Sequence, residues 1–157
     1  REEHAVVTAM LRETLAPLVT ELVLPRVPRI VRSARLHHLQ TDVIGTLRPG
    51  LGLLDAVARL HPPPAVGGWP TEAALDLLDE ETGLDRGWYA GPIGWLGADG
   101  DGELMVALRS GVIDHTKATL FAGCGIVADS DPELEWEESR MKLRAVASAL
   151  GRPGDLP

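Results

Sequence analysis

Apolar residues recur every three or four positions in four stretches of this chain, which is the spacing of an amphipathic helix. The helices are predicted over residues 3–19, 51–60, 71–81 and 132–150. Pro70 opens the third helix, and Gly83 is a suitable residue to end it. Ser130 or Asp131 provides an N-cap for the fourth, which Gly151 stops.

Strict alternation of apolar and polar residues predicts strands elsewhere. Residues 36–47 form one such strand, with His38, Gln40 and Asp42 on its polar face. Alternation further along predicts three antiparallel strands over residues 89–95, 104–109 and 118–127, with a turn at 110–117. Gly123 and Gly125 share a face of the last strand, which leaves a shelf free of side chains.

The last helix carries a polar stripe, because Glu135, Glu138 and Lys142 follow one another at helical spacing. Two interpretations of this stripe stay open. Glu138 and Lys142 form an ordinary ion pair on a solvated face, or the stripe faces the glycines and binds an anion together with a divalent cation. The stripe continues into Val146 and Ala149, so it turns inward at its far end.

Two further polar residues lie on faces that are otherwise expected to pack. Glu3 continues the apolar stripe of the first helix, where a carboxylate is costly unless it is paired or bound to a metal. The alternative is a frayed first turn in which Glu3 interacts favourably with the helix dipole. His38 either lines a polar cavity or has a structural role on a strand that meets water.

Composition narrows the classes of protein and partner. The 157 residues fit one domain, and 45% are hydrophobic, so the chain is expected to fold. A net charge of −8 argues against a nucleic-acid partner, which needs a basic face. Cys124 is the single cysteine, so no intramolecular disulfide forms, which fits a reducing, cytoplasmic compartment.

The sequence lacks signals for targeting and motifs for binding nucleotides or zinc. No apolar run approaches the roughly 20 residues needed to span a bilayer, so no membrane association is expected. Phosphate-cradling loops, dinucleotide fingerprints and zinc spacings are also missing. No signal peptide or initiating methionine is visible, and we expect the chain to be cut out of something longer.

Several segments together resemble one family, the chorismate-binding enzymes. The matching segments are residues 3–4, 38–41 with Gly45, 60–70, 85–95, 108–109 and 122–142. They follow the family's order and cover nearly the whole chain, and the last is the most specific. The resemblance implies an α+β fold, similar to anthranilate synthase component I, in which helices flank antiparallel sheets. Residues 1–157 then form the C-terminal portion of a single domain whose N-terminal half is absent.

The resemblance also implies a cleft that holds Mg²⁺ and chorismate. Metal ligands would be Glu3 and Glu138, with Glu135 beside them, directly or through water. Mg²⁺ is a hard ion that takes few carboxylates and keeps several waters, which suits such a set. The substrate-binding residues that the resemblance implies are His38 and Thr41 near the ring, Tyr89, Arg109 and Gly123 at the enolpyruvyl carboxylate, and Gly125 and Lys142 at the ring carboxylate.

The loop at residues 61–68 indicates which branch of the family the chain is nearest. Branches that install an amine carry threonine where this chain has Ala65, and a lysine where it has Thr71. The loop with Ala65 is similar to that of isochorismate synthases, which implies addition of water at C2 of chorismate with loss of the C4 hydroxyl. The isochorismate formed would serve siderophore, menaquinone or other biosynthesis.

Departures from the family pattern leave alternatives open. Cys124 replaces the usual alanine, and Pro63 stands where threonine is common. The family's general base is a lysine and its general acid a glutamate, and both are expected upstream of this chain, so the piece alone is expected to be inactive. Other chorismate-using synthases (salicylate, anthranilate or aminodeoxychorismate) and a non-catalytic chorismate-binding remnant remain alternatives. The intact protein is expected to be a monomer or homodimer.

Overall fold

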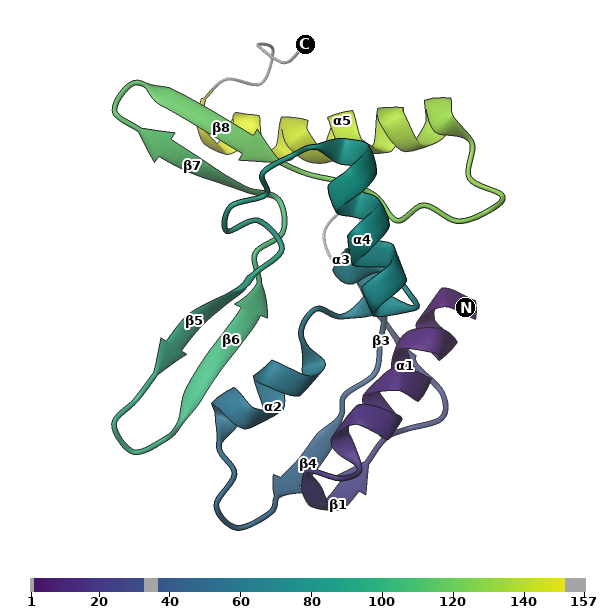
Figure 1. Ribbon diagram of the computed structural model, residues 1–157, viewed down its shortest axis with the longest axis vertical. Helices are drawn as coiled ribbons and strands as arrows, with labels where there is room; N and C mark the ends of the chain where they lie inside the picture. Colours follow the sequence, from purple (N-terminus) through teal and green to yellow (C-terminus); the bar gives the residue numbers. More distant parts are fainter. Residues whose placement is uncertain (1, 33–36, 152–157) are drawn as a thin grey trace. The chain divides into compact units, whose positions relative to one another are not determined.

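Helices alternate with short antiparallel hairpins in the computed structural model, which describes residues 2–32 and 37–151 (Figure 1). The elements in chain order are α1 Glu2–Leu15, β1 Val19–Val23, β2 Arg29–Arg32, β3 His37–Gln40, β4 Ile44–Leu47, α2 Leu53–Leu60, α3 Pro64–Gly67, α4 Thr71–Thr82, β5 Pro92–Leu96, β6 Gly102–Val106, β7 Ser110–Asp114, β8 Lys117–Phe121 and α5 Pro132–Ala149. Each described sheet is a two-stranded pair, namely β1–β4, β2–β3, β5–β6 and β7–β8. The architecture is α+β, as expected.

The described chain divides into two compact units. The first takes in the described residues up to Pro64 together with Trp95–Glu103, and the second takes in Ala65–Gly94 and the described residues from Leu104 onward. The hairpin β5–β6 contributes residues to both. Among the described helices, none is both long enough and apolar enough to span a membrane.

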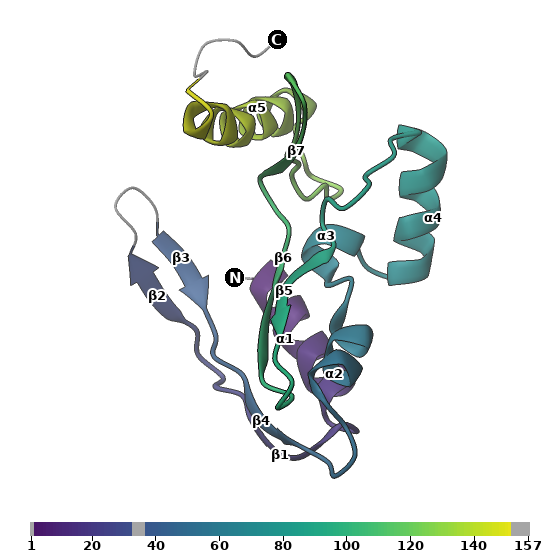
Figure 2. The same ribbon diagram turned by 90° about the vertical axis from the view of Figure 1, so that its left-hand side faces the viewer.

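The first unit begins with a helix that is shorter than predicted. α1 ends at Leu15 because Pro17 has no N–H to donate, and the chain turns directly into β1. The side chain of Arg48 closes this corner by donating from Nε to the carbonyl of Pro17 at 2.9 Å. β1 pairs with β4, and Val19 at the start of this pair is buried (Figure 2).

The single strand predicted over residues 36–47 is wrong, because the chain breaks between β3 and β4. The two strands pair with different partners, β3 with β2 and β4 with β1. Asp42 lies in the break, where its carboxylate accepts hydrogen bonds from Arg29 at 3.1 and 3.3 Å and from Gln40 at 2.7 Å. The Arg29 hydrogen bond, followed by that of Gln40, lowers the pKa of Asp42 below its usual value.

Residues 87–127 form four strands, β5 to β8, rather than the three predicted there. The segment expected as a turn at 110–117 is mostly β7, which pairs with β8 through a tight turn at His115. Tyr89 lies in a turn before β5 and not in a strand. β8 ends at Phe121, so the shared strand face predicted for Gly123 and Gly125 is also wrong.

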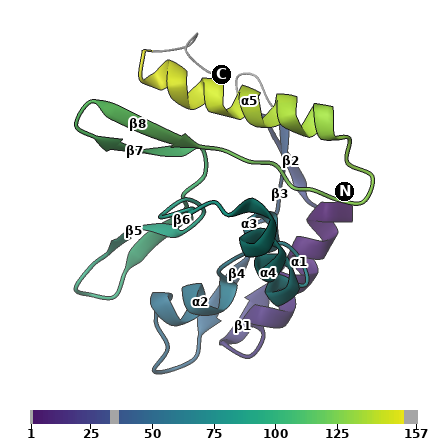
Figure 3. The same cartoon turned by 45° about the horizontal axis from the view of Figure 1, so that its top comes forward.

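The end of α5 and its beginning agree with the prediction. Asp131 is the N-cap, and its carboxylate accepts a hydrogen bond from the backbone N–H of Leu134 at 3.1 Å. Ala147 is buried on the apolar side of the helix, which packs against β8 (Figure 3). The helix that carries the polar stripe is therefore held by its N-cap and by its packing against β8.

The loop between α3 and α4 depends on one glycine. Gly68 has φ +77°, and a Cβ atom there would overlap the Cβ of Ala74. Alanine in left-handed backbone costs about 1–2 kcal/mol before any overlap is counted. We therefore expect Gly68→Ala to lower the free energy of unfolding of the intact protein by more than this amount, measured by urea denaturation.

Gly50→Ala is the matched control, because Gly50 has φ +87° and open space around it. Gly50→Ala should lower the free energy of unfolding only by the cost of placing alanine in left-handed backbone. Equal losses for the two variants would show that the contact with Ala74 relaxes freely.

Candidate functional site

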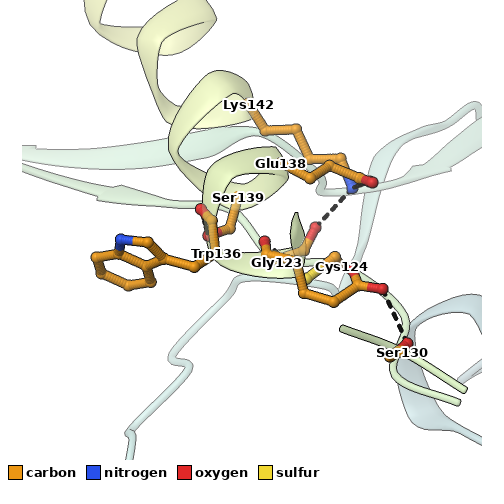
Figure 4. A network of polar contacts seen from close by, with 8 residues as sticks. Gly123, Cys124, Ser130, Trp136, Glu138, Ser139 and Lys142 are labelled. Atoms are coloured by element: carbon orange, nitrogen blue, oxygen red, sulfur yellow. Dashed lines mark hydrogen bonds and ion pairs between the residues drawn. The ribbon is translucent and has the colours of Figure 1, made fainter. Parts of the chain in front are cut away.

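The polar stripe of α5 faces the segment that follows β8. The Nζ atom of Lys142 lies 2.5 Å from Oε1 of Glu138 and donates a hydrogen bond to the carbonyl oxygen of Gly123 at 2.9 Å (Figure 4). The Lys142 side chain is only 23% exposed, whereas that of Glu138 is 49% exposed. The predicted ion pair is present, but its lysine is directed at the glycine segment and is not on a plainly solvated face.

Glu135, one turn before Glu138, is held by a different group. The hydroxyl of Ser130 donates to Oε1 of Glu135 at 2.8 Å, and the thiol of Cys124 donates to the Glu135 backbone carbonyl at 3.4 Å (Figure 4). Partial burial, followed by the hydrogen bond and charge of Glu135, raises the pKa of the Cys124 thiol. A raised pKa disfavours the thiolate, which is the nucleophilic form of cysteine.

Tyr89 stands directly beside Gly123. Its ring stacks on that of Phe121, with ring centres 5.6 Å apart and ring planes at 16°. A Cβ atom at Gly123 would lie 3.3 Å from the Tyr89 hydroxyl, closer than most Cβ contacts. The absence of a side chain at residue 123 thus gives the phenol access to the backbone, in agreement with the grouping that the family resemblance implies.

Arg109 is brought to the same region by the strand pairing. The turn of Tyr89 is tied to the end of β6, because Ala90 N–H donates to the Ala107 carbonyl at 3.0 Å. On the other side of Arg109, Ser110 pairs with Phe121. Arg109 itself has φ +48°, which is uncommon for a residue with a side chain and is found at functional sites more often than elsewhere. Arg109 is an exposed residue.

Ala65 and Gly125 belong to the same unit. Ala65 lies exposed in α3, and the next residue, Val66, accepts a hydrogen bond at its carbonyl from Nη1 of Arg86 at 3.1 Å. Arg86 also starts the turn of Tyr89, whose N–H donates to the Arg86 carbonyl at 2.9 Å. A Cβ atom at Gly125 would meet nothing within 4 Å, so the backbone there is accessible.

The remaining predicted site residues belong to the first unit. Glu3 lies in α1 and His38 in β3, but their side chains are outside the described residues. Thr41 lies in the break between β3 and β4. No group of three or more metal-ligating side chains occurs among the residues described. Glu135 and Glu138 therefore stand as a pair of carboxylates one helical turn apart.

The sequence did not indicate two of the residues that shape this group. Ser130 was considered only as an N-cap, and Asp131 takes that role. Arg86 carried no signal, since an arginine in a polar turn is ordinary. Together the second unit places an ammonium beside the carboxylate of Glu138 and a phenol beside the backbone of Gly123, and it also contains Arg109. Such a set suits a ligand with several carboxylates and a hard divalent cation.

Comparison with known proteins agrees with this chemistry. A family model described as chorismate binding enzyme matches residues 1–151. The chain is 44% identical to the salicylate biosynthesis isochorismate synthase of Pseudomonas aeruginosa over 156 residues, which are 99% of this chain and 33% of that protein. It is 43% identical to isochorismate synthase MenF of Bacillus subtilis over 149 residues, which are 95% of this chain and 32% of that protein.

The likeness extends to the fold. A crystal structure of DhbC from Bacillus anthracis superposes with a TM-score of 0.90 at 36% identity, covering 96% of this chain and 40% of that one. The chain spans about a third of the length of the curated relatives above. Given a match over residues 1–151 and a shared fold, this chain belongs to the chorismate-binding enzyme family.

Proposed function

We propose that the intact protein containing this chain converts chorismate to isochorismate in a Mg²⁺-dependent reaction. The observation that carries the proposal is the contact of Lys142 with both Glu138 and the Gly123 carbonyl, beside the Tyr89 hydroxyl. This contact places an ammonium between a carboxylate and bare backbone. The relatives named above as isochorismate synthases support the choice of reaction.

Substrate recognition rests on the two carboxylates of chorismate. Arg109 and Tyr89, with the backbone at Gly123, would bind the enolpyruvyl carboxylate, because a guanidinium donates two parallel hydrogen bonds to such a group. Lys142 would meet the ring carboxylate together with backbone N–H groups near Gly125. His38 and Thr41 would line the wall beside the ring.

Glu135 and Glu138, together with Glu3, would hold Mg²⁺. Their carboxylate oxygens are the donors that this hard ion takes, and two of the three lie one turn apart on α5. The bound ion would anchor the ring carboxylate and withdraw charge from the ring. Lys142 balances the charge of Glu138.

The reaction exchanges one hydroxyl position for another. Water forms a bond at C2, both double bonds of the ring shift by one position, and the C4 hydroxyl leaves. A base takes one proton from the attacking water and an acid gives one proton to the leaving hydroxyl, so the two sides balance. We assign both roles to residues outside this chain, a lysine and a glutamate. The chain's own part is to bind the substrate and orient its ring.

Ala65 distinguishes this proposal from an amine-installing synthase. Those branches have threonine at this position and a lysine at the position of Thr71. Ala65 offers no hydroxyl, and Arg86 holds its loop to the turn of Tyr89. The nucleophile is therefore proposed to be water and not ammonia.

The reaction is tested by incubating the intact protein with chorismate and Mg²⁺ and separating the products. Isochorismate is expected, and chelation of the metal should stop its formation. Anthranilate, aminodeoxychorismate or salicylate as the sole product would contradict the proposal. Binding of chorismate without any product would identify a non-catalytic chorismate-binding protein.

Removal of a metal carboxylate tests the role of α5. Glu138→Gln should weaken Mg²⁺ binding by more than the roughly 10–100-fold seen for residues outside the ligand shell. The affinity is measured by titration calorimetry on the intact protein. Glu137→Gln is the matched control, because Glu137 is the exposed neighbour on the same helix. Similar affinities for the two variants would refute the metal role of Glu138.

The guanidinium of Arg109 is tested by its effect on the chorismate KM. A hydrogen bond between charged groups contributes roughly 1.5–3 kcal/mol, so Arg109→Ala should raise KM by about 10- to 100-fold. Arg109→Lys should recover part of the loss, since it keeps the charge without the paired donors. Arg144→Ala, at an exposed position of α5, is the control. An unchanged KM for Arg109→Ala would leave Arg109 as a surface charge.

A further inference from the structure

The hydroxyl of Ser130 links the turn before α5 to the carboxylate of Glu135. The backbone N–H of Val127 donates to Ser130 Oγ at 3.1 Å, and the N–H of Ser130 donates back to the Val127 carbonyl at 3.0 Å. These two bonds close the turn on itself. The third contact of Ser130 is the 2.8 Å hydrogen bond from its hydroxyl to Oε1 of Glu135.

The direction of each hydrogen bond at Ser130 is fixed by the donors available. A serine hydroxyl has one proton and two acceptor lone pairs. The Val127 N–H occupies one lone pair, and an ionised carboxylate only accepts, so the hydroxyl proton is committed to Glu135. Ser130 therefore holds one oxygen of Glu135 and leaves the other for a second partner.

Glu135 and Glu138 differ in what their carboxylates offer a cation. Glu138 is paired with the charged Lys142, whereas the described contact of Glu135 is with a neutral hydroxyl. A neutral donor orients a carboxylate without cancelling its charge. Metal-ligating carboxylates are commonly oriented by such outer hydrogen bonds, whose loss weakens metal binding about 10–100-fold.

We propose that Ser130 is a positioning residue that orients Glu135 for Mg²⁺, through its hydroxyl and not through its N-cap position. The inference rests on the proposed function, because it takes Glu135 as a metal residue. It adds to that function a residue that binds neither the metal nor the substrate. The N-cap of α5 is Asp131, so removal of the Ser130 hydroxyl leaves the helix start intact.

Three variants of the intact protein test this role by Mg²⁺ titration calorimetry. Ser130→Ala should weaken Mg²⁺ binding by about 10-fold or more. Ser130→Thr keeps the hydroxyl and should restore affinity to within a few-fold of the wild type. Ser139→Ala is the matched control, because its hydroxyl lies on the same helix but donates to the Trp136 carbonyl at 2.8 Å and to no carboxylate.

Kinetics provide a second readout that a general loss of structure would not reproduce. At saturating Mg²⁺ the Ser130→Ala enzyme should regain most of its kcat with little change in the chorismate KM. The requirement for Mg²⁺ alone should shift upward. A fall in kcat that excess Mg²⁺ does not reverse, or a failure of Ser130→Thr to rescue, would show a structural role instead.

The outcomes separate this inference from the proposed function. Wild-type protein that binds Mg²⁺ and forms isochorismate, together with an unchanged Mg²⁺ affinity in Ser130→Ala, would overturn only the role of Ser130. Wild-type protein that does not bind Mg²⁺ would overturn both.

Discussion

The hydrogen bond from Lys142 to the Gly123 carbonyl is the contact on which the arrangement of the second unit depends. It joins the middle of α5 to the segment after β8, which has left the sheet and has no strand partner of its own in the described chain. Gly123 has no side chain, and a Cβ atom there would meet the Tyr89 hydroxyl at 3.3 Å but no atom of Lys142. The same lack of a side chain admits the Tyr89 hydroxyl from the other side.

Glu135 and Glu138 on α5 have partners of different charge. Glu138 gains a nearby ammonium, and Glu135 gains a hydroxyl. One helix thus carries two carboxylates in different electrostatic settings, although they lie a single turn apart. Tyr89 also stacks on Phe121, and Ser110 pairs with Phe121 between β7 and β8. Both contacts support the segment next to Gly123.

Local signals predicted the helices better than the strands. Asp131 and Pro132 start α5 and Gly83 ends α4, because caps act within one turn of their own backbone. The break at Asp42 was missed because Arg29, which holds it, is 13 residues away in sequence. A long alternating stretch does not reveal that its two halves pair with different strands.

The candidate site shows the same contrast between local signals and contacts that are distant in the sequence. Helical spacing alone grouped Glu135, Glu138 and Lys142, and the structure places all three on one face of α5 near residues 123–125. The two glycines were predicted to share the face of a strand, which is wrong because β8 ends at Phe121. The bond from Ser130 depends on how the turn closes, which composition and spacing do not encode.

The bond that Lys142 makes to Gly123 also has an effect on the far side of the peptide group. The carbonyl of Gly123 and the N–H of Cys124 belong to one planar amide and point in opposite directions. An ammonium on the oxygen draws electron density through that plane, and hydrogen bonds in series strengthen one another by about 10–30%. Lys142 thereby makes the N–H of Cys124 a better donor. The polarised peptide group between Gly123 and Cys124 would thus favour an anion that accepts a hydrogen bond from this N–H.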